Sequence, residues 1–412
     1  MMTAMYDVIV VGARCAGSSL AMLLARRGHR VLLVDRAAFP SDTVSSHLVH
    51  PPGVERLDRW GLLPMLMATG CPPLPQMRFD LEGITFRSRP PMDTPRDAVC
   101  PRRHVLDPLL ADAAVRAGAE FRPSFTVKEL VTENDAVVGI RGREHGGGEV
   151  TDRARIVVGA DGVGSAVARL VGAERYREHA PLTHAYYSYW SGIDASEVEW
   201  YGRPGLGVAV APTHHGLTGI AVGLSTRDRP SAPRPVEAAY LEALHQVERV
   251  AERVREGRME ERVAGRASHP NVFRTAFGPG WALVGDAGYA KDPTPAQGIS
   301  DAFRDAELLD QALDDGLAGE RPMEDALADY AERRDREALP GYEFTMRIAE
   351  LKAMSQKDRQ VTEAIADDQR LSDRWGGMFA GTVTPAEFLV DMRTLLRELR
   401  ARRTGAEATG PQ

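Results

Sequence analysis

Apolar runs that end at glycine or aspartate organise the N-terminal part of the chain. Residues 8–11 (VIVV) form a continuous β-branched run that ends at Gly12, as is typical of a strand buried on both faces of a parallel sheet. Residues 18–27 repeat leucine at helical spacing and precede Gly28, and residues 31–35 (VLLVD) form a second apolar run closed by an aspartate. This pattern predicts a β-α-β unit with a glycine after the helix.

Two later stretches repeat the step from a buried strand through a turn to a helix. The first is IVVGADGVGSAVARLVG (residues 156–172), and the second is GWALVGDAGYAKDPTPAQGISDAFRDAELL (residues 280–309). In the second stretch the strand extends to Val284, and a proline-bearing loop leads to a helix that begins near Gly298. The chain therefore predicts three strand-to-helix corners of one α/β architecture.

The first turn, VVGARCAGSSL (residues 10–20), resembles a dinucleotide-binding turn of the form Gly-x-Gly-x-x-Gly. Gly12 and Gly17 are in place, and Arg14 replaces the middle glycine. A helix start can bind a diphosphate, and Asp35 at the end of the next strand can bind a ribose diol. The Arg14 side chain either hinders the approach of a phosphate or turns outward and pairs with it. Taken alone, the unit also fits a plain crossover with an ordinary surface aspartate.

Together, the three stretches resemble the FAD-dependent monooxygenase superfamily of the aromatic-hydroxylase type, which includes flavin-dependent halogenases and geranylgeranyl-reductase-like enzymes. That superfamily combines an N-terminal nucleotide turn, a middle Asp-Gly motif and a late Gly-Asp motif. Here the middle motif is Asp161-Gly162 and the late motif is Gly285-Asp286. The resemblance covers residues 6 to 310 and implies FAD as a bound cofactor.

The resemblance also assigns roles within the late stretch. Asp286 corresponds to the acid that binds the ribityl chain of FAD. In the Pro-x-x-Gly-x-Gly loop of the family, Pro293 and Gly298 are present, whereas Ala296 replaces the first glycine. The helix that starts near Gly298 should direct its N-terminus at the isoalloxazine, where free N–H groups stabilise the negative charge of reduced flavin.

One arginine outside these motifs matches a family arginine that opens a helix and reaches the cofactor. It is Arg103, with Arg102 as a competitor and a solvated helix-start arginine as the alternative. The predicted cofactor-binding residues are Gly12, Arg14, Cys15, Ala16, Gly17, Asp35, Arg36, Arg103, Asp161, Gly162, Gly285, Asp286, Pro293, Ala296, Gln297, Gly298 and Ile299.

The predicted fold class is α/β, with a Rossmann-like FAD-binding domain, an inserted antiparallel β-sheet substrate domain and a C-terminal helical segment. Segments rich in strand-forming residues alternate with turn signals in the inserted parts. The predicted ranges are 1–76, 95–180 and 267–340 for the FAD-binding domain, 77–94 and 181–266 for the substrate domain, and 341–412 for the C-terminal helical region.

Candidates for catalysis come from one strand and one loop, and no residue is assigned as acid or base. Tyr187 and Tyr189 share a face of a predicted strand, and that face either lines the pocket or packs against helices. His47 and His50 follow the second strand, and each either approaches the flavin edge or serves a structural role. The histidine pair at 214–215 lies at a turn, where a surface position is expected.

Composition and charge mainly exclude certain kinds of partner and binding site. The chain has 412 residues and a net charge of -7, which gives no electrostatic reason to expect a nucleic-acid partner. Three scattered cysteines indicate neither a disulfide framework nor a zinc site, and the histidines lack metal-ligand spacing. No apolar run approaches the length of a membrane span, and the start of the chain lacks a secretory signal. We expect a cytoplasmic monomer or homodimer without metal, nucleic-acid or membrane partners.

For the reaction, the resemblance implies first an NAD(P)H-dependent monooxygenase, an oxidoreductase of secondary metabolism. It would transfer oxygen from O2 through a flavin C4a-hydroperoxide to a small aromatic or heteroatom-containing substrate. No separate second nucleotide domain is present, so NAD(P)H is expected to bind transiently as co-substrate. The alternative is an FAD-dependent reductase or dehydrogenase of the geranylgeranyl-reductase type.

Two further readings are weaker. A halogenase of this superfamily carries a Trp-x-Trp-x-Ile-Pro motif and an early lysine, whereas this chain lacks the motif and has no lysine before Lys128. A binding protein that has lost catalysis is disfavoured because Asp35, Asp161 and Asp286 are intact.

Overall fold

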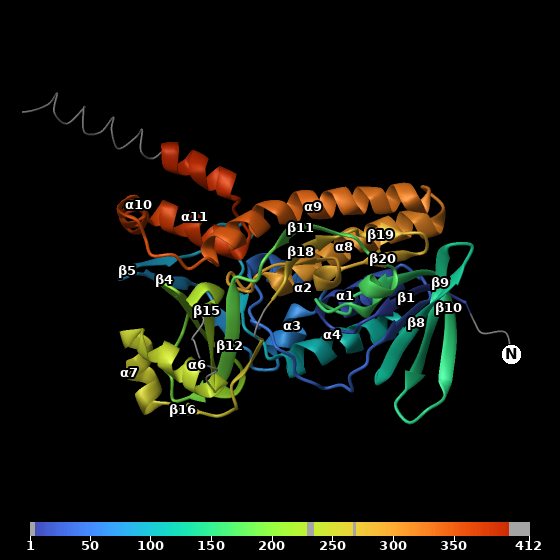
Figure 1. Ribbon diagram of the computed structural model, residues 1–412, viewed down its shortest axis with the longest axis horizontal. Helices are drawn as coiled ribbons and strands as arrows, with labels where there is room; N and C mark the ends of the chain where they lie inside the picture. Colours follow the sequence, from blue (N-terminus) through green and yellow to red (C-terminus); the bar gives the residue numbers. More distant parts are fainter. Residues whose placement is uncertain (1–4, 229–234, 267–268, 395–412) are drawn as a thin grey trace, which may run out of the picture.

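A mainly parallel β-sheet forms the core of the molecule, with a second sheet and a C-terminal group of helices beside it (Figure 1). The computed structural model describes residues 5–228, 235–266 and 269–394. The core sheet follows the order β19-β20-β10-β1-β2-β7. Its strands are β1 (Tyr6–Val11), β2 (Val31–Val34), β7 (Glu120–Arg122), β10 (Glu149–Gly159), β19 (Phe277–Gly278) and β20 (Trp281–Leu283). The predicted α/β class is confirmed.

Alternate residues of β1 face two different layers, which explains why the strand is apolar at nearly every position. Val8 and Val10 pack in a core with the helices on one face of the sheet, and Ile9 and Val11 pack on the other face against an antiparallel extension. The helices of the first layer are α1 (Cys15–Arg26), α2 (Pro51–Arg59), α3 (Leu63–Met67), α4 (Arg103–Ala117) and α8 (Gly298–Ala318). The other face carries β8 (Phe125–Glu133), β9 (Ala136–Glu144) and α5 (Ala166–Leu170).

The second sheet joins segments that are far apart in the sequence. Its order is β16-β12-β15-β14-β13-β4-β5, with β17 also paired to β12. All its pairings are antiparallel except β13 with β4, which run parallel. The strands are β4 (Met77–Leu81), β5 (Ile84–Ser88), β12 (Thr183–Ser191), β13 (Val198–Arg203), β14 (Leu206–Pro212), β15 (Thr218–Ser225), β16 (Arg258–Met259) and β17 (Ala264–Arg266).

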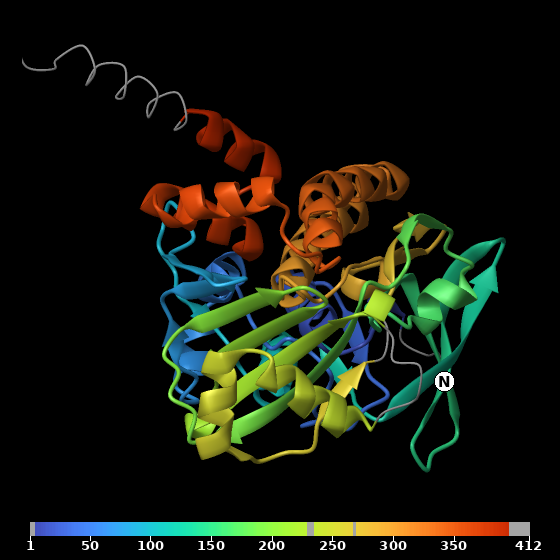
Figure 2. The same ribbon diagram turned by 60° about the vertical axis from the view of Figure 1, so that its left-hand side comes forward.

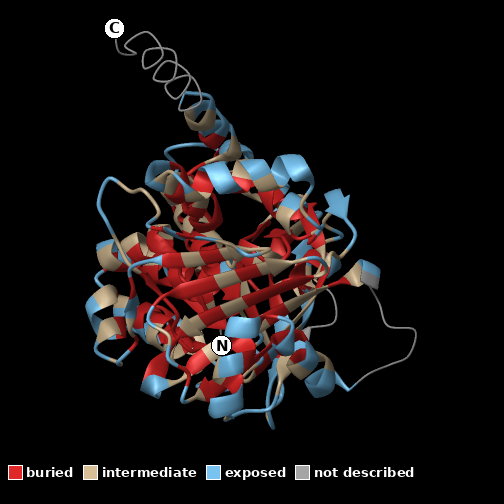
Figure 3. Cartoon of the chain, turned by 90° about the vertical axis from the view of Figure 1, so that its left-hand side faces the viewer, coloured by how far each residue is buried: buried red, intermediate tan, exposed pale blue. Residues whose placement is uncertain are grey.

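Two helices cover the outer face of the second sheet, α6 (Val236–His245) and α7 (Glu248–Glu256), as Figure 2 shows. These helices bury the outer face of the second sheet, and its strands are largely buried in the view of Figure 3. Smaller pairings complete the fold: β3 (Pro73–Leu74) with β6 (Ala98–Val99), and β11 (Arg175–His179) with β18 (Asn271–Arg274) and β21 (Tyr289–Ala290). The 3-10 turns are η1 (His214–Gly216), η2 (Thr226–Asp228) and η3 (Gly285–Ala287).

The C-terminal helices are α9 (Met323–Ile348), α10 (Gln356–Ala366) and α11 (Gln369–Ala380). The predicted domain boundary at residue 340 falls inside α9, because Pro340 lies within a helix that continues past it. Helices α10 and α11 pack on β4 and β5 through an aromatic core. Residues 395–412 of the predicted helical region lie outside the described residues. Within the described ranges, every helix is too short or too polar to cross a bilayer.

Candidate functional site

The three predicted corners meet because they follow the carboxyl ends of three neighbouring parallel strands. Val11 at the end of β1 pairs with Gly159 at the end of β10, which pairs in turn with Leu283 of β20. Strand β2 ends on the other side of β1, with Val34 opposite Val11. Ligands of open α/β sheets bind outside this edge of the strands. We call this region, with its three turns, the corner edge.

Glycines allow the first turn of the corner edge to interlock with the second and the third turns. Gly12 has a φ of +109°, and a Cβ added to it would lie 2.4 Å from the carbonyl oxygen of Ala160. A Cβ on Gly17 would lie 1.8 Å from the carbonyl oxygen of Gly12, and one on Gly285 would lie 2.8 Å from the Cβ of Ala16. These glycines are therefore required by backbone packing.

A cavity of about 820 Å³ opens at the corner edge and extends to the second sheet. This volume suits a large organic ligand. Gly17 and Gln297 are not among the described residues that line it. The predicted cofactor residues that do line it are Gly12, Arg14, Cys15, Ala16, Asp35, Arg36, Arg103, Asp161, Gly162, Gly285, Asp286, Pro293, Ala296, Gly298 and Ile299.

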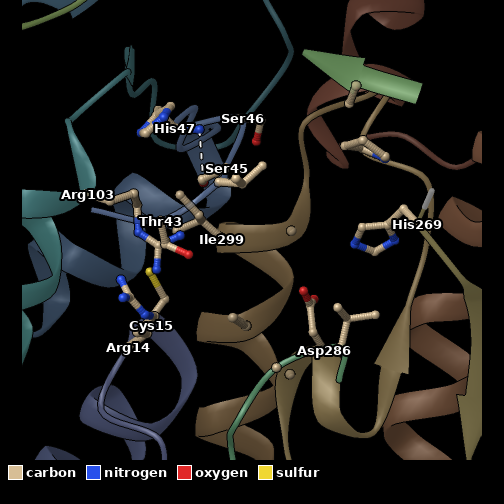
Figure 4. Close-up of a pocket in the computed structure, with 18 of the residues that line it drawn as sticks. Arg14, Cys15, Thr43, Ser45, Ser46, His47, Arg103, His269, Asp286 and Ile299 are labelled. Carbon is tan, nitrogen blue, oxygen red and sulfur yellow. Dashed lines mark hydrogen bonds between the residues drawn. The ribbon is translucent and has the colours of Figure 1, made fainter. Parts of the chain in front are cut away.

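Arg14 turns away from the helix start and joins a buried charge cluster. One of its guanidinium nitrogens lies 2.5 Å from a carboxylate oxygen of Asp107, and Arg103 lies 2.8 Å from the other oxygen. The Asp107 side chain is fully buried, so two cations share one anion beside the start of α1. Figure 4 shows Arg14, Cys15 and Arg103 gathered on one side of the cavity. The surplus positive charge favours a phosphate group there.

Of the two competing arginines, Arg103 lines the cavity. The guanidinium of Arg102 instead lies 3.9 Å from the centre of the Tyr189 ring, a cation–π contact. It also forms ion pairs of 3.3 Å with Asp42 and 2.6 Å with Glu261. Arg102 therefore connects the loop after β2 to the second sheet.

Asp35 and Asp161 first hold their own turns. The carboxylate of Asp35 accepts the N–H of Ala13 at 2.7 Å and that of Ala37 at 2.8 Å. The carboxylate of Asp161 accepts the Ser165 hydroxyl at 2.5 Å and two backbone N–H groups at the start of α5. Each carboxylate has about four acceptor positions, and both residues line the cavity, so acceptor capacity remains for a ligand.

An arginine that no motif marks joins the second and third turns. Arg274 on β18 donates to the carbonyl oxygens of Val163 at 3.0 Å, Asp286 at 3.2 Å and Ala287 at 2.9 Å. It is only 5% exposed, and burial lowers the pKa of Arg274. Asp286 lies across the start of α8 from the Arg14 side of the cavity, near His269 (Figure 4).

The start of α8 opens into the cavity. A Cβ on Gly298 would meet no atom within 4 Å, and no side chain caps the first turn of the helix. Ala296 keeps a φ of +57° although it replaces a glycine. The Nε2 of His50 donates to the carbonyl oxygen of Pro295 at 2.8 Å, and burial lowers the pKa of His50 to about 4. Neutral His50 therefore holds the loop that leads into α8, and it does not line the cavity.

Gln297 differs from its predicted role, because its side chain faces α11. Its amide nitrogen donates to the carbonyl oxygens of Met378 and Phe379 at 2.9 and 2.8 Å, and its amide oxygen accepts Lys291 at 2.5 Å. Lys291, which the sequence did not mark, lines the cavity and pairs with Asp301 at 2.8 Å. Burial lowers the pKa of Lys291.

The structure brings the three catalytic candidates, Tyr187, Tyr189 and His47, to one wall of the cavity. The Tyr189 hydroxyl lies 2.9 Å from Nε2 of His47, and the Tyr187 ring packs against the imidazole at 5.1 Å between centroids. His47 is 4% exposed, and its Nδ1 has no hydrogen-bond partner among the described residues. Burial, aided by Arg103, lowers the pKa of His47 to about 3, so the imidazole is neutral. Burial raises the pKa of Tyr187 to about 12.

One histidine expectation is wrong. His214 is fully buried rather than at the surface, because its Nε2 lies 2.8 Å from the Thr69 hydroxyl and its Nδ1 accepts the Arg102 backbone N–H at 3.3 Å. His215, next to it, is exposed as expected. In the described ranges, no three His, Cys, Asp or Glu side chains are grouped to hold a metal ion.

The donor set at the corner edge fits FAD. Two helix starts and an arginine pair face the cavity, carboxylates lie at the strand ends, and the glycines at 162 and 298 leave open space where a Cβ would point. Such an edge suits an elongated ligand with a diphosphate, sugar hydroxyls and a ring that becomes negative on reduction.

A family model described as FAD binding domain matches residues 5–340. The digeranylgeranylglycerophospholipid reductase of Methanosarcina acetivorans is 26% identical over 409 residues, which cover 95% of this chain and 97% of that protein. The 6-methylpretetramide 4-monooxygenase of Streptomyces rimosus is 28% identical over 355 residues, 80% of each protein. The structure of a myxobacterial chondrochloren halogenase superposes with a TM-score of 0.78 at 24% identity, over 90% of this chain and 92% of that one.

Proposed function

The chain belongs to the FAD-binding domain family and is an FAD-dependent oxidoreductase, and from that premise we propose that it is an NAD(P)H-dependent monooxygenase acting on a small aromatic or heteroatom-containing substrate. The observation that carries the proposal is the shared cavity. The corner edge and the Tyr187–Tyr189 face line the same space, so a substrate on the second sheet can lie beside the flavin ring.

Four features of the corner edge would hold FAD. The diphosphate would lie at the start of α1 near Arg14 and Arg103, the adenosine ribose at Asp35, and the ribityl chain at Asp286. The start of α8 would face the ring and stabilise its negative charge. When bound and reduced by NAD(P)H, FAD supplies the electrons and activates O2.

His47 is the group we assign to holding the substrate hydroxyl. Its Nε2 lies 2.9 Å from the Tyr189 hydroxyl, and its Nδ1 has no hydrogen-bond partner among the described residues. A substrate hydroxyl can donate to Nδ1 or accept from it, according to the tautomer of the imidazole. His47 therefore positions the phenol and does not deprotonate it, because burial lowers the pKa of His47 to about 3.

The segment after β2 would exclude water from the cavity. Arg14 donates to Ser41 at 3.1 Å, Arg102 pairs with Asp42 at 3.3 Å, and Tyr187 donates to the carbonyl oxygen of Thr43 at 3.4 Å. These contacts hold the segment between the two sheets, which protects reactive oxygen chemistry from side reactions.

The second candidate is a reductase of the geranylgeranyl-reductase type. The observation in its favour is the reductase of Methanosarcina acetivorans, which aligns with 95% of this chain. Such an enzyme would use the same cofactor edge and transfer a hydride to an alkene without O2.

Oxygen-18 labelling separates the two candidates. FAD-loaded protein is supplied with NADPH, labelled O2 and 2-naphthol, and the product is analysed by mass spectrometry. We expect one labelled oxygen in the product and faster NADPH oxidation when the phenol is present. NADPH consumption without labelled product, together with anaerobic reduction of farnesol, would instead establish the reductase.

A further inference from the structure

The second sheet presents a flat surface of small residues to the cavity. We call this surface the floor, and it consists of Gly219, Ala221 and Gly223 of β15 and Ala209 and Ala211 of β14. In register, Ala221 pairs with Ala209 and Gly219 with Ala211. The small residues therefore form one continuous patch across two neighbouring strands.

Aromatic side chains stand on both sides of the floor. On the β12 side, Tyr187 pairs with Ala221 and Tyr189 with Gly219. On the β13 side, Trp200 pairs with Ala209. All three aromatic residues line the cavity. The floor is thus bounded by aromatic rings, which favour contact with a flat aromatic ligand.

On β14 and β15, the side chains on the face away from the cavity are large, so the patch of small residues is confined to the cavity face. Val208 and Val210 of β14 and Ile220 and Val222 of β15 pack in the core formed with α6 and α7. Branched residues are the usual choice in strands, and glycine weakens a strand because it has no side chain to pack. A Cβ on Gly223 would meet nothing closer than 3.9 Å, so the space above the floor is open.

The dimensions of the floor fit a planar ligand better than a linear one. The strands that carry the walls, β12 and β13, are three inter-strand steps apart, about 14 Å between backbones, and residues 219 to 223 span about 13 Å along β15. An extended hydrocarbon chain needs a groove only about one inter-strand step wide, roughly 5 Å. The floor can therefore hold a ligand that extends in two directions, across the strands and along them. A linear ligand would leave most of the floor uncovered.

A polar anchor lies at one side of the floor. His47 is 4% exposed, contacts Tyr187 and Tyr189, and has an Nδ1 atom without a hydrogen-bond partner among the described residues. A buried polar atom without a partner is costly, and a ligand hydroxyl, which can both donate and accept, would remove that cost.

From the floor, its aromatic walls and this anchor, we propose that the substrate is a planar, fused-ring phenol that lies flat on the floor with its hydroxyl at Nδ1 of His47. The inference rests on the proposed function and narrows it to a substrate class. The floor makes ring number and flatness the features that decide affinity, and His47 makes the hydroxyl position decisive.

Binding to FAD-loaded protein tests the inference without turnover. Phenol, 2-naphthol and 2-anthrol are titrated in the absence of O2 and NADPH, and the absorbance change of the bound flavin and the tryptophan fluorescence are read. We expect Kd to fall about tenfold with each added ring, because each ring buries more apolar surface. Farnesol, which has a similar number of carbon atoms to 2-anthrol but is linear, should bind about tenfold or more weakly than 2-anthrol.

Variants of the floor and the anchor provide the matched controls. Ala221→Leu and Ala209→Leu should each weaken 2-anthrol binding about tenfold or more, because the new side chain fills the open space above the floor. Ala221→Ser keeps the floor flat and should retain binding. His47→Phe should abolish the roughly tenfold preference for 2-naphthol over naphthalene. Thermal melting and flavin content show whether each variant is folded.

Three results would overturn the inference: no gain in affinity from one ring to three, farnesol binding as tightly as 2-anthrol, or full 2-anthrol affinity in folded Ala221→Leu and Ala209→Leu. The ring series on the unmodified protein decides the matter even if the leucine variants fail to fold. Ring-dependent binding without labelled oxygen in any product would leave the inference standing and remove the proposed monooxygenase activity.

Discussion

The corner edge and the floor line one cavity but are built in opposite ways. At the corner edge, glycines interlock, and backbone or side-chain donors hold the carboxylates of Asp35 and Asp161. On the floor, the residues are small, apolar and open to the cavity. The first region allows almost no change because its backbone is in close contact, whereas the second can change its ligand by changing one side chain.

This difference separates the two tasks of the site. The corner edge receives a ligand whose shape is constant, and its contacts are made by backbone geometry at four strand ends. The floor receives the variable ligand, and its shape depends on which residues are placed opposite one another by strand register. Substitutions in the two regions should therefore have different effects, as the following tests show.

The largest effect is expected at Gly12. Gly12→Ala should reduce the free energy of unfolding by about 3 kcal/mol or more, because the new Cβ would clash with the Ala160 carbonyl in addition to a strained backbone. Gly28→Ala is the control, with a φ of +93° but nothing within 4 Å, and should cost about 1–2 kcal/mol. Urea unfolding measures both, and equal losses would contradict the interlocked corner.

Asp286→Ala should weaken FAD binding about tenfold to a hundredfold, because a charge-assisted hydrogen bond contributes about 1.5–3 kcal/mol. Titration of the apo-protein with FAD, followed by flavin fluorescence, gives the affinity. Ala221→Ser in the floor should leave that affinity unchanged. An unaltered FAD affinity in Asp286→Ala would remove this residue from the cofactor site.

The loop before α8 should make stability depend on pH. The pKa of His50 in the folded protein is about 4, below the ordinary value of about 6.5, so below about pH 6.5 the unfolded chain binds more protons. Its contribution is present above that pH and is lost as pH falls toward 4, at about 1.4 kcal/mol per pH unit. His50→Asn should lower the slope of the unfolding free energy against pH by about 1.4 kcal/mol per pH unit, measured by urea unfolding between about pH 6.5 and 5. The buried His47 and His214, whose pKa values burial also lowers, contribute the slope that remains.

The exposed His145 is the matched control for that experiment. His145→Asn should leave the pH dependence of unfolding unchanged, since its environment is similar in the folded and unfolded chain. An unchanged slope in His50→Asn would contradict the contribution assigned to His50.

Arg14→Gly should retain bound FAD, with a loss of affinity of no more than about tenfold. Asp107 keeps its ion pair with Arg103, and the Arg14 side chain is 26% exposed, so solvent screens its charge. The same FAD titration measures the effect. Complete loss of flavin would identify Arg14 as a principal anchor of the diphosphate.

The smallest effect is a gain. Ala296→Gly should raise the free energy of unfolding by about 0.5 kcal/mol, because relief of the left-handed backbone, about 1–2 kcal/mol, is partly offset by about 0.5–1 kcal/mol of added freedom in the unfolded chain. The melting temperature reports the change. A clear loss of stability would indicate that the methyl group of Ala296 makes necessary contacts.

The sequence predicted much of the corner edge and little of the floor. The strand before Gly12, the strand that ends at Gly159 and the helix that starts at Gly298 could be predicted, because buried runs and glycine turns are local patterns. The contacts of Arg274 and Gln297 could not be predicted from local patterns. Their partners are 111 and 81 residues away in the sequence, and no local pattern records such contacts.

The substrate side was predicted only in outline. Alternation along β12 indicated that Tyr187 and Tyr189 share a face, but which face lines the cavity depends on the layer of α6 and α7. The meeting of Tyr189 with His47 joins residues 142 positions apart. The floor required the register of four strands, which a single sequence does not specify.

A crystal structure of the protein with FAD and 2-anthrol tests the central claim most directly. We predict the diphosphate at the start of α1, the isoalloxazine between the start of α8 and the floor, and the phenol flat on the floor with its hydroxyl at His47. A flavin ring bound away from the second sheet, or a phenol outside the cavity, would contradict this account.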